Sequence, residues 1–131
     1  MFHYVTLGSN DLPRSKRFYD AALGPLGIIN TIADDADVAY AETPRPGEKP
    51  VNLLWVLKPL LALPANWGNG TMIVFTAKSR AAVDAFHAGA MSNGGIDEGA
   101  PGLRRYSPNF YACYVRDPDG NKLSAVCEKP E

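Results

Sequence analysis

The chain has 131 residues, of which 46% are hydrophobic and 21% charged, and its formal net charge is -1. A chain of this length suits one compact domain over residues 1–131, which buries roughly two thirds of the surface exposed by the unfolded form. Because charges of both signs are interspersed, no block suits a nucleic-acid backbone or an anionic membrane. The longest apolar run, residues 53–63, is interrupted by Lys58 and Pro59 and is too short to span a bilayer, so we expect a cytoplasmic protein.

The first half of the chain predicts a strand, a helix and three further strands. Residues 2–7 have a strand composition, and the turn residues 8–10 end them. Asp11 is a suitable N-cap for a helix whose apolar residues repeat at helical spacing, until the Gly/Pro-rich residues 24–27 stop it. Three short strand candidates follow: residues 28–33, 38–42 and 51–57.

The second half repeats this order after a linker over residues 58–70. Residues 71–76 again have a strand composition. Ser79 is a suitable N-cap for a second helix, which residues 93–95 close with Asn-Gly-Gly. The repeat lies in the pattern of elements rather than in the identity of the residues.

Near the end of the chain, residues 110–116 and 122–127 predict a hairpin joined by a tight turn. The connection before it, residues 99–109, has no strand pattern, and we expect a loop that gates a cavity. The predicted fold is therefore α+β, with two βαβββ modules that form a curved mixed sheet around a cavity. The modules are expected to cover about residues 1–58 and 70–131.

Strand alternation sorts the side chains between the two faces of each sheet, since the helices must cover the more apolar face. On the opposite face we expect a set of cavity-lining residues from the first, fifth and last strands: Tyr4, Thr6, Met72, Val74 and Ser124. In the predicted hairpin Tyr114 lies opposite Ser124 and joins this face. The same register places Arg116 opposite Lys122, a like-charge pair that a neighbouring acid would relieve.

Three further side chains are candidates for ligand binding: Arg105, Tyr106 and Trp55. Arg105 and Tyr106 follow Arg104 in the predicted loop. Arginine grips a carboxylate through two hydrogen bonds and tyrosine stacks on rings, so this loop is predicted to select an acidic or aromatic ligand. The alternative is a solvated loop. Trp55 is placed equally well on the cavity wall or in the core.

The two cysteines, Cys113 and Cys127, are too few for a disulfide framework or a zinc cluster. In the predicted hairpin they are diagonal neighbours about 7–8 Å apart and poorly placed to bond to each other. We expect both to be inert core thiols.

Four groups of residues, spread in order over nearly the whole chain, carry a family resemblance. They are residues 5–8 with Asp11, Leu12, Ser15, Phe18 and Tyr19; Gly70, Thr71 and Phe75; residues 79–86; and Asp117-Pro118-Asp119-Gly120-Asn121. With these groups the chain resembles the vicinal oxygen chelate superfamily of glyoxalases, bleomycin-resistance proteins and ring-cleaving dioxygenases. The resemblance implies a glyoxalase-like fold and a homodimer.

Metal-dependent members of that superfamily place a His on the first strand, a His on the matching strand of the second module and a Glu on the last strand. In this chain those positions correspond to Tyr4, Met72 and Ser124. A tyrosine must lose a proton with a pKa near 10, and methionine and serine offer neutral donors, so the three suit a divalent metal poorly. We therefore expect no metal cofactor. His3 lies beside the expected position, but alternation points it to the other face.

Without a metal, the expected cavity offers hydroxyl groups, a thioether and apolar surface, which suit binding better than turnover. The sequence favours a metal-free protein that binds a small organic molecule, aromatic or acidic, and that resembles the drug-sequestering members of the superfamily. Two alternatives stay open. One is a metal-dependent lyase, isomerase or dioxygenase, and the other is an enzyme without a metal that uses Tyr4 or Tyr114 as its polar group.

Overall fold

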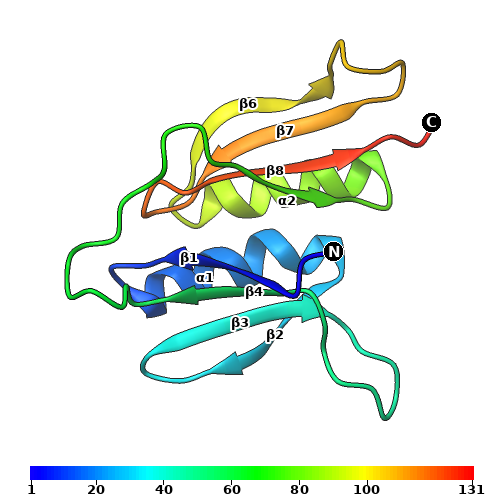
Figure 1. Ribbon diagram of the computed structural model, residues 1–131. Coiled ribbons are helices and arrows are strands. Elements are labelled where there is room, and N and C mark those ends of the chain that lie inside the picture. The colour runs from blue at the N-terminus through cyan, green and yellow to red at the C-terminus, as the bar shows by residue number, and fades with distance from the viewer.

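The computed structural model describes residues 1–131 and contains two modules with the same order of elements (Figure 1). The first module consists of β1 (Tyr4–Gly8), α1 (Leu12–Leu23), a short 3-10 helix η1 (Gly24–Leu26), β2 (Ile28–Ala33), β3 (Asp37–Glu42) and β4 (Leu53–Leu57). The second consists of β5 (Ile73–Thr76), α2 (Arg80–Ser92), β6 (Ile96–Leu103), β7 (Tyr111–Arg116) and β8 (Lys122–Cys127). None of the helices has the length and apolar character that a membrane span requires.

Each module forms its own four-stranded sheet, with the strand orders β1-β4-β3-β2 and β5-β8-β7-β6. In both sheets the first pair is parallel and the other pairs are antiparallel. The predicted α+β fold of two βαβββ modules is therefore confirmed. The mixed sheet is divided, because hydrogen-bonded strand pairs occur within each module and not between the modules.

The helix starts follow the predicted capping chemistry. The Asp11 carboxylate accepts a hydrogen bond from the backbone N–H of Arg14 at 2.9 Å, and the Ser79 hydroxyl accepts one from Ala82 at 3.1 Å. Each cap satisfies a backbone donor that the first turn of a helix leaves free. Gly27, with a φ of 78°, takes the left-handed conformation that turns the chain from η1 into β2.

One core cluster of 20 buried residues draws on both modules. Helices α1 and α2 lie next to each other where the modules meet (Figure 1), and Phe18 and Phe86 are fully buried among them. The approach is close at Gly89 on α2, where a Cβ atom would clash with the carbonyl oxygen of Ala21 on α1. Because each helix packs against one face of its own sheet, a ligand or a partner can approach the opposite face.

The two modules correspond in register. Thr6 and Val74 each precede the N-cap of the following helix by five residues, and they pair with Trp55 and Ser124. The next strand pairs Trp55 with Ala39 in the first sheet and Ser124 with Tyr114 in the second.

The predicted register of the β7–β8 hairpin is confirmed. Tyr114 pairs with Ser124, Arg116 with Lys122, and Cys113 with Ala125. Both cysteines are buried and free, as expected. Burial raises the pKa of the Cys113 thiol to about 11, which keeps it protonated and unreactive near neutral pH.

The predicted loop over residues 99–109 is wrong in its first part. Strand β6 extends through Leu103 and pairs with β7, with register shifts between Asp97 and Gly99 and between Gly99 and Gly102. Glycine and proline have a low propensity for strands, so this segment does not have a strand composition. It forms a strand because the edge of β7 supplies its backbone hydrogen-bond partners. Only residues 104–110 remain as the connection.

Candidate functional site

The open face of the second sheet carries a hollow of about 760 Å³. Its wall combines aromatic rings, cationic side chains and a carboxylate: Met72, Glu98, Gly99, Arg104, Tyr106, Phe110, Tyr114 and Lys122. Met72 directly precedes β5, and the other residues come from β6, β7, β8 and the β6–β7 connection. The hollow therefore gathers ring faces and positive charge in one place.

Tyr114 stands at the centre of this arrangement because β7 lies between β6 and β8 in the sheet. The guanidinium carbon of Arg104 lies 5.5 Å from the centre of the Tyr114 ring, and Nζ of Lys122 lies 5.8 Å from it. Both distances are within the range of cation–π attraction. The Tyr114 ring thus contacts both cations and helps to fix their positions at the floor of the hollow.

The bulges of β6 hold Arg104 in position. Ala100 lies in a bulge of the strand, and Nη2 of Arg104 donates to its carbonyl oxygen at 2.6 Å. Nη1 donates to the carbonyl oxygen of Leu103 at 3.3 Å. Gly102 leaves the space for the guanidinium, since a Cβ atom there would lie 3.0 Å from Nη1.

Glu98, the extra residue of the first bulge, bridges the like-charge pair on the neighbouring strands. Its carboxylate accepts from Nε of Arg116 at 2.7 Å and from Nζ of Lys122 at 3.0 Å. The acid expected to relieve this pair is therefore present. The hydrogen bonds from Arg116 and Lys122 lower the pKa of Glu98, so its carboxylate stays ionised at neutral pH.

Two aromatic side chains of the β6–β7 connection form a further wall of the hollow. The rings of Tyr106 and Phe110 meet edge to face, with their centres 5.0 Å apart. Tyr106 remains 76% exposed, so much of its ring is available for contact with a ligand.

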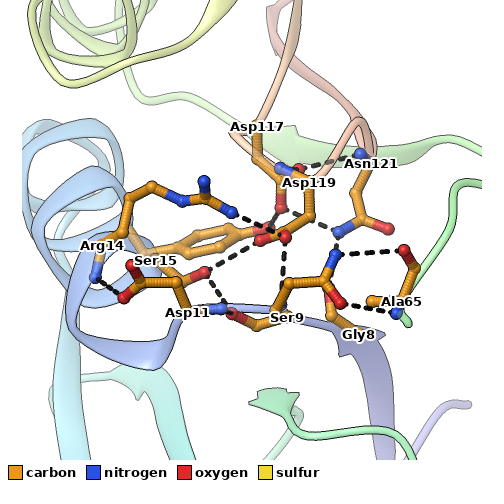
Figure 2. A network of polar contacts seen from close by, with 11 residues as sticks. Gly8, Ser9, Asp11, Arg14, Ser15, Ala65, Asp117, Asp119 and Asn121 are labelled. Carbon is orange, nitrogen blue, oxygen red and sulfur yellow. Dashed lines mark hydrogen bonds and ion pairs between the residues drawn. The ribbon is translucent and has the colours of Figure 1, made fainter. Parts of the chain in front are cut away.

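A polar network fixes the β7–β8 hairpin, and with it the hollow, against the first module (Figure 2). The Asp119 carboxylate accepts hydrogen bonds from the backbone N–H of Asn10 at 3.0 Å, from Nη2 of Arg14 at 2.9 Å and from the Ser15 hydroxyl at 3.1 Å. Asn121 donates from its side chain to the carbonyl oxygen of Gly8 at 3.1 Å. The turn is thus bonded to the end of β1 and the start of α1.

Asp117 organises the turn from within. Its side chain accepts from the backbone N–H groups of Asp119 and Asn121, from the Asn121 side chain, and from the Tyr19 hydroxyl at 2.6 Å. Burial raises the pKa of Asp117, against the opposing effect of these donors. The carboxylate serves the architecture, because its acceptor positions are occupied inside the protein.

Three of the sequence-predicted residues, Met72, Tyr106 and Tyr114, come together in this hollow. Two others, Tyr4 and Val74, line a separate and mostly apolar hollow of about 340 Å³ where β1 and β5 meet.

The remaining predicted residues line neither hollow. Thr6 is exposed and Trp55 is half-buried. Arg105 is exposed, outside the group that its neighbour Arg104 joins. Ser124 is fully buried, and its hydroxyl has no hydrogen-bond partner.

Sequence reasoning missed Glu98 and Phe110 as lining residues, and it noted Arg104 in the loop and Lys122 opposite Arg116 without assigning either to the site. The like-charge pair of Arg116 and Lys122 was the signal for an acid in the neighbourhood. Nothing in the sequence distinguished Arg104 from Arg105, because the bulges of β6 break the alternation of side chains.

A family model described as "Glyoxalase/Bleomycin resistance protein/Dioxygenase superfamily" matches residues 1–124. The chain belongs to this superfamily. No protein of curated function matches the sequence. Membership in the superfamily fixes the fold, while the activity depends on the residues of the site.

Solved structures agree with the superfamily assignment. A glyoxalase/bleomycin resistance protein from Albidiferax ferrireducens T118 is 40% identical and has a TM-score of 0.83, with 98% of each chain covered. A glyoxalase-related enzyme from Fulvimarina pelagi has a TM-score of 0.75 at 17% identity, over 97% of this chain and 87% of that one. A lactoylglutathione lyase from Agrobacterium tumefaciens has a TM-score of 0.61 at 18% identity, over 97% and 92%. The last two show the fold alone.

The metal that many superfamily members hold does not fit the side chains at the corresponding positions. Tyr4 is 56% exposed in the apolar hollow, Met72 lies in the other hollow, and Ser124 is fully buried. A phenol, a thioether and a hydroxyl group are poor ligands for a divalent metal compared with imidazole or carboxylate. Nowhere does the structure bring together three His, Cys, Asp or Glu side chains that could hold a metal ion.

Proposed function

We propose that this superfamily member binds a small organic molecule, aromatic or acidic, in the hollow of the second module, and that it does so without a metal. The observation that carries this proposal is the Tyr114 ring with Arg104 and Lys122 over it, next to the Tyr106–Phe110 pair. Ring faces and fixed cations are the groups that bind flat or anionic molecules. The poor donor chemistry of Tyr4, Met72 and Ser124 supports binding without a metal.

The ionisation of Glu98 favours binding over turnover. A general acid working at neutral pH needs a pKa near that pH, and the hydrogen bonds from Arg116 and Lys122 move the pKa of Glu98 the other way. Both of its partners also occupy the carboxylate, so it is poorly placed to accept a proton from a ligand.

The proposal is tested by isothermal titration calorimetry, in which chelator-treated protein is titrated with a panel of small neutral and acidic aromatic molecules. We expect saturable binding that is unchanged by added nickel, zinc, manganese or iron. The Tyr114→Ala variant should weaken it at least tenfold, because the ring that orders both cations is lost. Binding that arises only after a metal is added would instead favour the metal-dependent lyase, isomerase or dioxygenase.

A second candidate, an enzyme without a metal, is favoured by the place of Tyr114 in the hollow. It requires the phenol to donate a hydrogen bond to an oxyanion. In that case Tyr114→Phe abolishes turnover and leaves ligand affinity almost intact, whereas a binding protein has no turnover to lose.

We further propose a cytoplasmic homodimer. Support comes from apolar side chains that the single chain leaves in solvent near the junction of the sheets, where Tyr4 is 56% and Val74 50% exposed. Contiguous apolar surface that is exposed on a single chain is typical of contact surfaces between proteins. The interspersed charges give no support to a nucleic-acid partner.

A further inference from the structure

The Arg104 guanidinium is a cation without a counter-ion. Its two side-chain hydrogen bonds go to the neutral carbonyl oxygens of Ala100 and Leu103. The carboxylate in the same hollow, Glu98, is occupied by Arg116 and Lys122. A guanidinium that lacks an anionic partner, on a side chain that is only partly exposed, favours an anion supplied from outside.

The geometry of this cation is fixed before any ligand arrives. Two backbone carbonyls, the Tyr114 ring and the space left by Gly102 hold the guanidinium in one place. Only two of its N–H groups are engaged in these bonds, so others stay free to donate. A guanidinium held in this way presents the planar fork that a carboxylate accepts through two bonds.

We infer that the hollow of the second module is a receptor for aromatic carboxylates, in which Arg104 binds the carboxylate and the Tyr106–Phe110 wall contacts the ring. This inference rests on the proposed function and names its ligand class. Lys122 adds positive charge at the floor of the hollow, since its Nζ carries three N–H donors and Glu98 does not use all of them. Arg105, exposed and outside the hollow, takes no part.

The test compares two probes of the same shape, 1-naphthoate and 1-naphthamide, by calorimetry at low salt. We expect the wild type to bind the acid at least about tenfold more tightly than the amide, because hydrogen bonds to an ionised acceptor are roughly twice as strong as neutral ones. Arg104→Gln should reduce the affinity for the acid to that for the amide.

Two further variants separate a specific receptor from a general effect of charge. Arg105→Gln removes the same charge one residue away, and we expect it to keep the preference for the acid. Gly102→Ala retains every charge but places a methyl group against Nη1 of Arg104, so it should weaken binding of the acid and leave that of the amide unchanged. Thermal unfolding of each variant confirms that it is folded.

Equal affinity of the wild type for acid and amide would overturn the inference and leave the proposed function standing. The same holds if Arg104→Gln and Arg105→Gln lose the preference to the same extent, because long-range charge then explains it. Absence of binding by every aromatic probe, acidic or neutral, would overturn both the inference and the proposed function.

Discussion

Ser124 and Ser15 are both fully buried serines, but only one of them has partners. The Ser15 hydroxyl lies 2.6 Å from that of Ser9 and donates to Asp119 at 3.1 Å, whereas the Ser124 hydroxyl has no partner. A buried polar group without a hydrogen bond costs roughly 1–3 kcal/mol.

Removal of the two hydroxyls should therefore act in opposite directions. We expect Ser124→Ala to raise the free energy of unfolding by about 1 kcal/mol and Ser15→Ala to lower it by about 1–2 kcal/mol, as measured by urea denaturation. A loss of stability in Ser124→Ala would show that its hydroxyl has a partner, such as a bound water.

The carboxylate of Glu98 should make stability depend on pH. Its pKa is lowered in the folded protein by the hydrogen bonds from Arg116 and Lys122, relative to an ordinary value of 4.5. The stabilisation is therefore fully present above the ordinary value and is lost as the pH falls through the lowered pKa of the folded state.

The comparison that checks this is the unfolding free energy of the wild type against Glu98→Gln at pH 7 and at about pH 3. We expect the wild type to be more stable at pH 7, and the difference to shrink on acidification. Glu48→Gln, at an exposed glutamate without an ion pair, should show no such change. A difference that is the same at both pH values would contradict the role of the charge.

Among the elements, the β7–β8 hairpin is joined to the first module through the side chains of its turn. Asp119 is a turn residue whose side chain is only 1% exposed, and it accepts three hydrogen bonds from the first module. We expect Asp119→Ala to lower the free energy of unfolding by about 3 kcal/mol, because it leaves these donors unpaired.

The matched control for this hairpin variant is Asp35→Ala, at an exposed aspartate of the turn before β3. It should change the stability by less than about 0.5 kcal/mol. If both variants have the same small effect, the network of Figure 2 contributes little to holding the modules together.

The elements that the sequence predicted well are those with local chemistry of their own. Asp11 and Ser79 predict where the helices start, because a capping side chain bonds to the backbone of its own first turn. The register of β7 and β8 follows from the short turn between them. Strand β6 was not predicted, because Gly99 and Gly102 have a low strand propensity and lie in a strand only through their pairing with β7.

The site was predicted in part for the same reason. Alternation places Met72 and Tyr114 on the open face correctly, since both lie in or beside regular strands. It fails at Arg104, whose direction is set by two bulges upstream, and at Glu98, which is itself the extra residue of a bulge. Residues that irregular backbone aims into a site are found only in three dimensions.

For the whole molecule, the proposed dimer gives a direct prediction. We expect light scattering to give twice the mass of one chain at micromolar concentration. Val74→Glu should shift the protein toward the monomer, because it places a charge in the apolar region where β1 and β5 meet.

The control for the dimer is Ile29→Glu, at a residue that is 43% exposed on the edge strand β2. It should leave the mass unchanged. A monomeric wild type, or two variants that dissociate equally, would contradict a contact at the β1–β5 junction.

The matching registers of the two sheets bear on how many ligand molecules one chain binds. At the place that Tyr114 takes in the second sheet, the first has Ala39, fully buried and without a ring to order a cation. The two modules thus repeat the same strand pairing but differ in the side chains at corresponding positions. A binding isotherm should saturate at one equivalent per chain, with the first module acting as an inactive copy inside the same molecule.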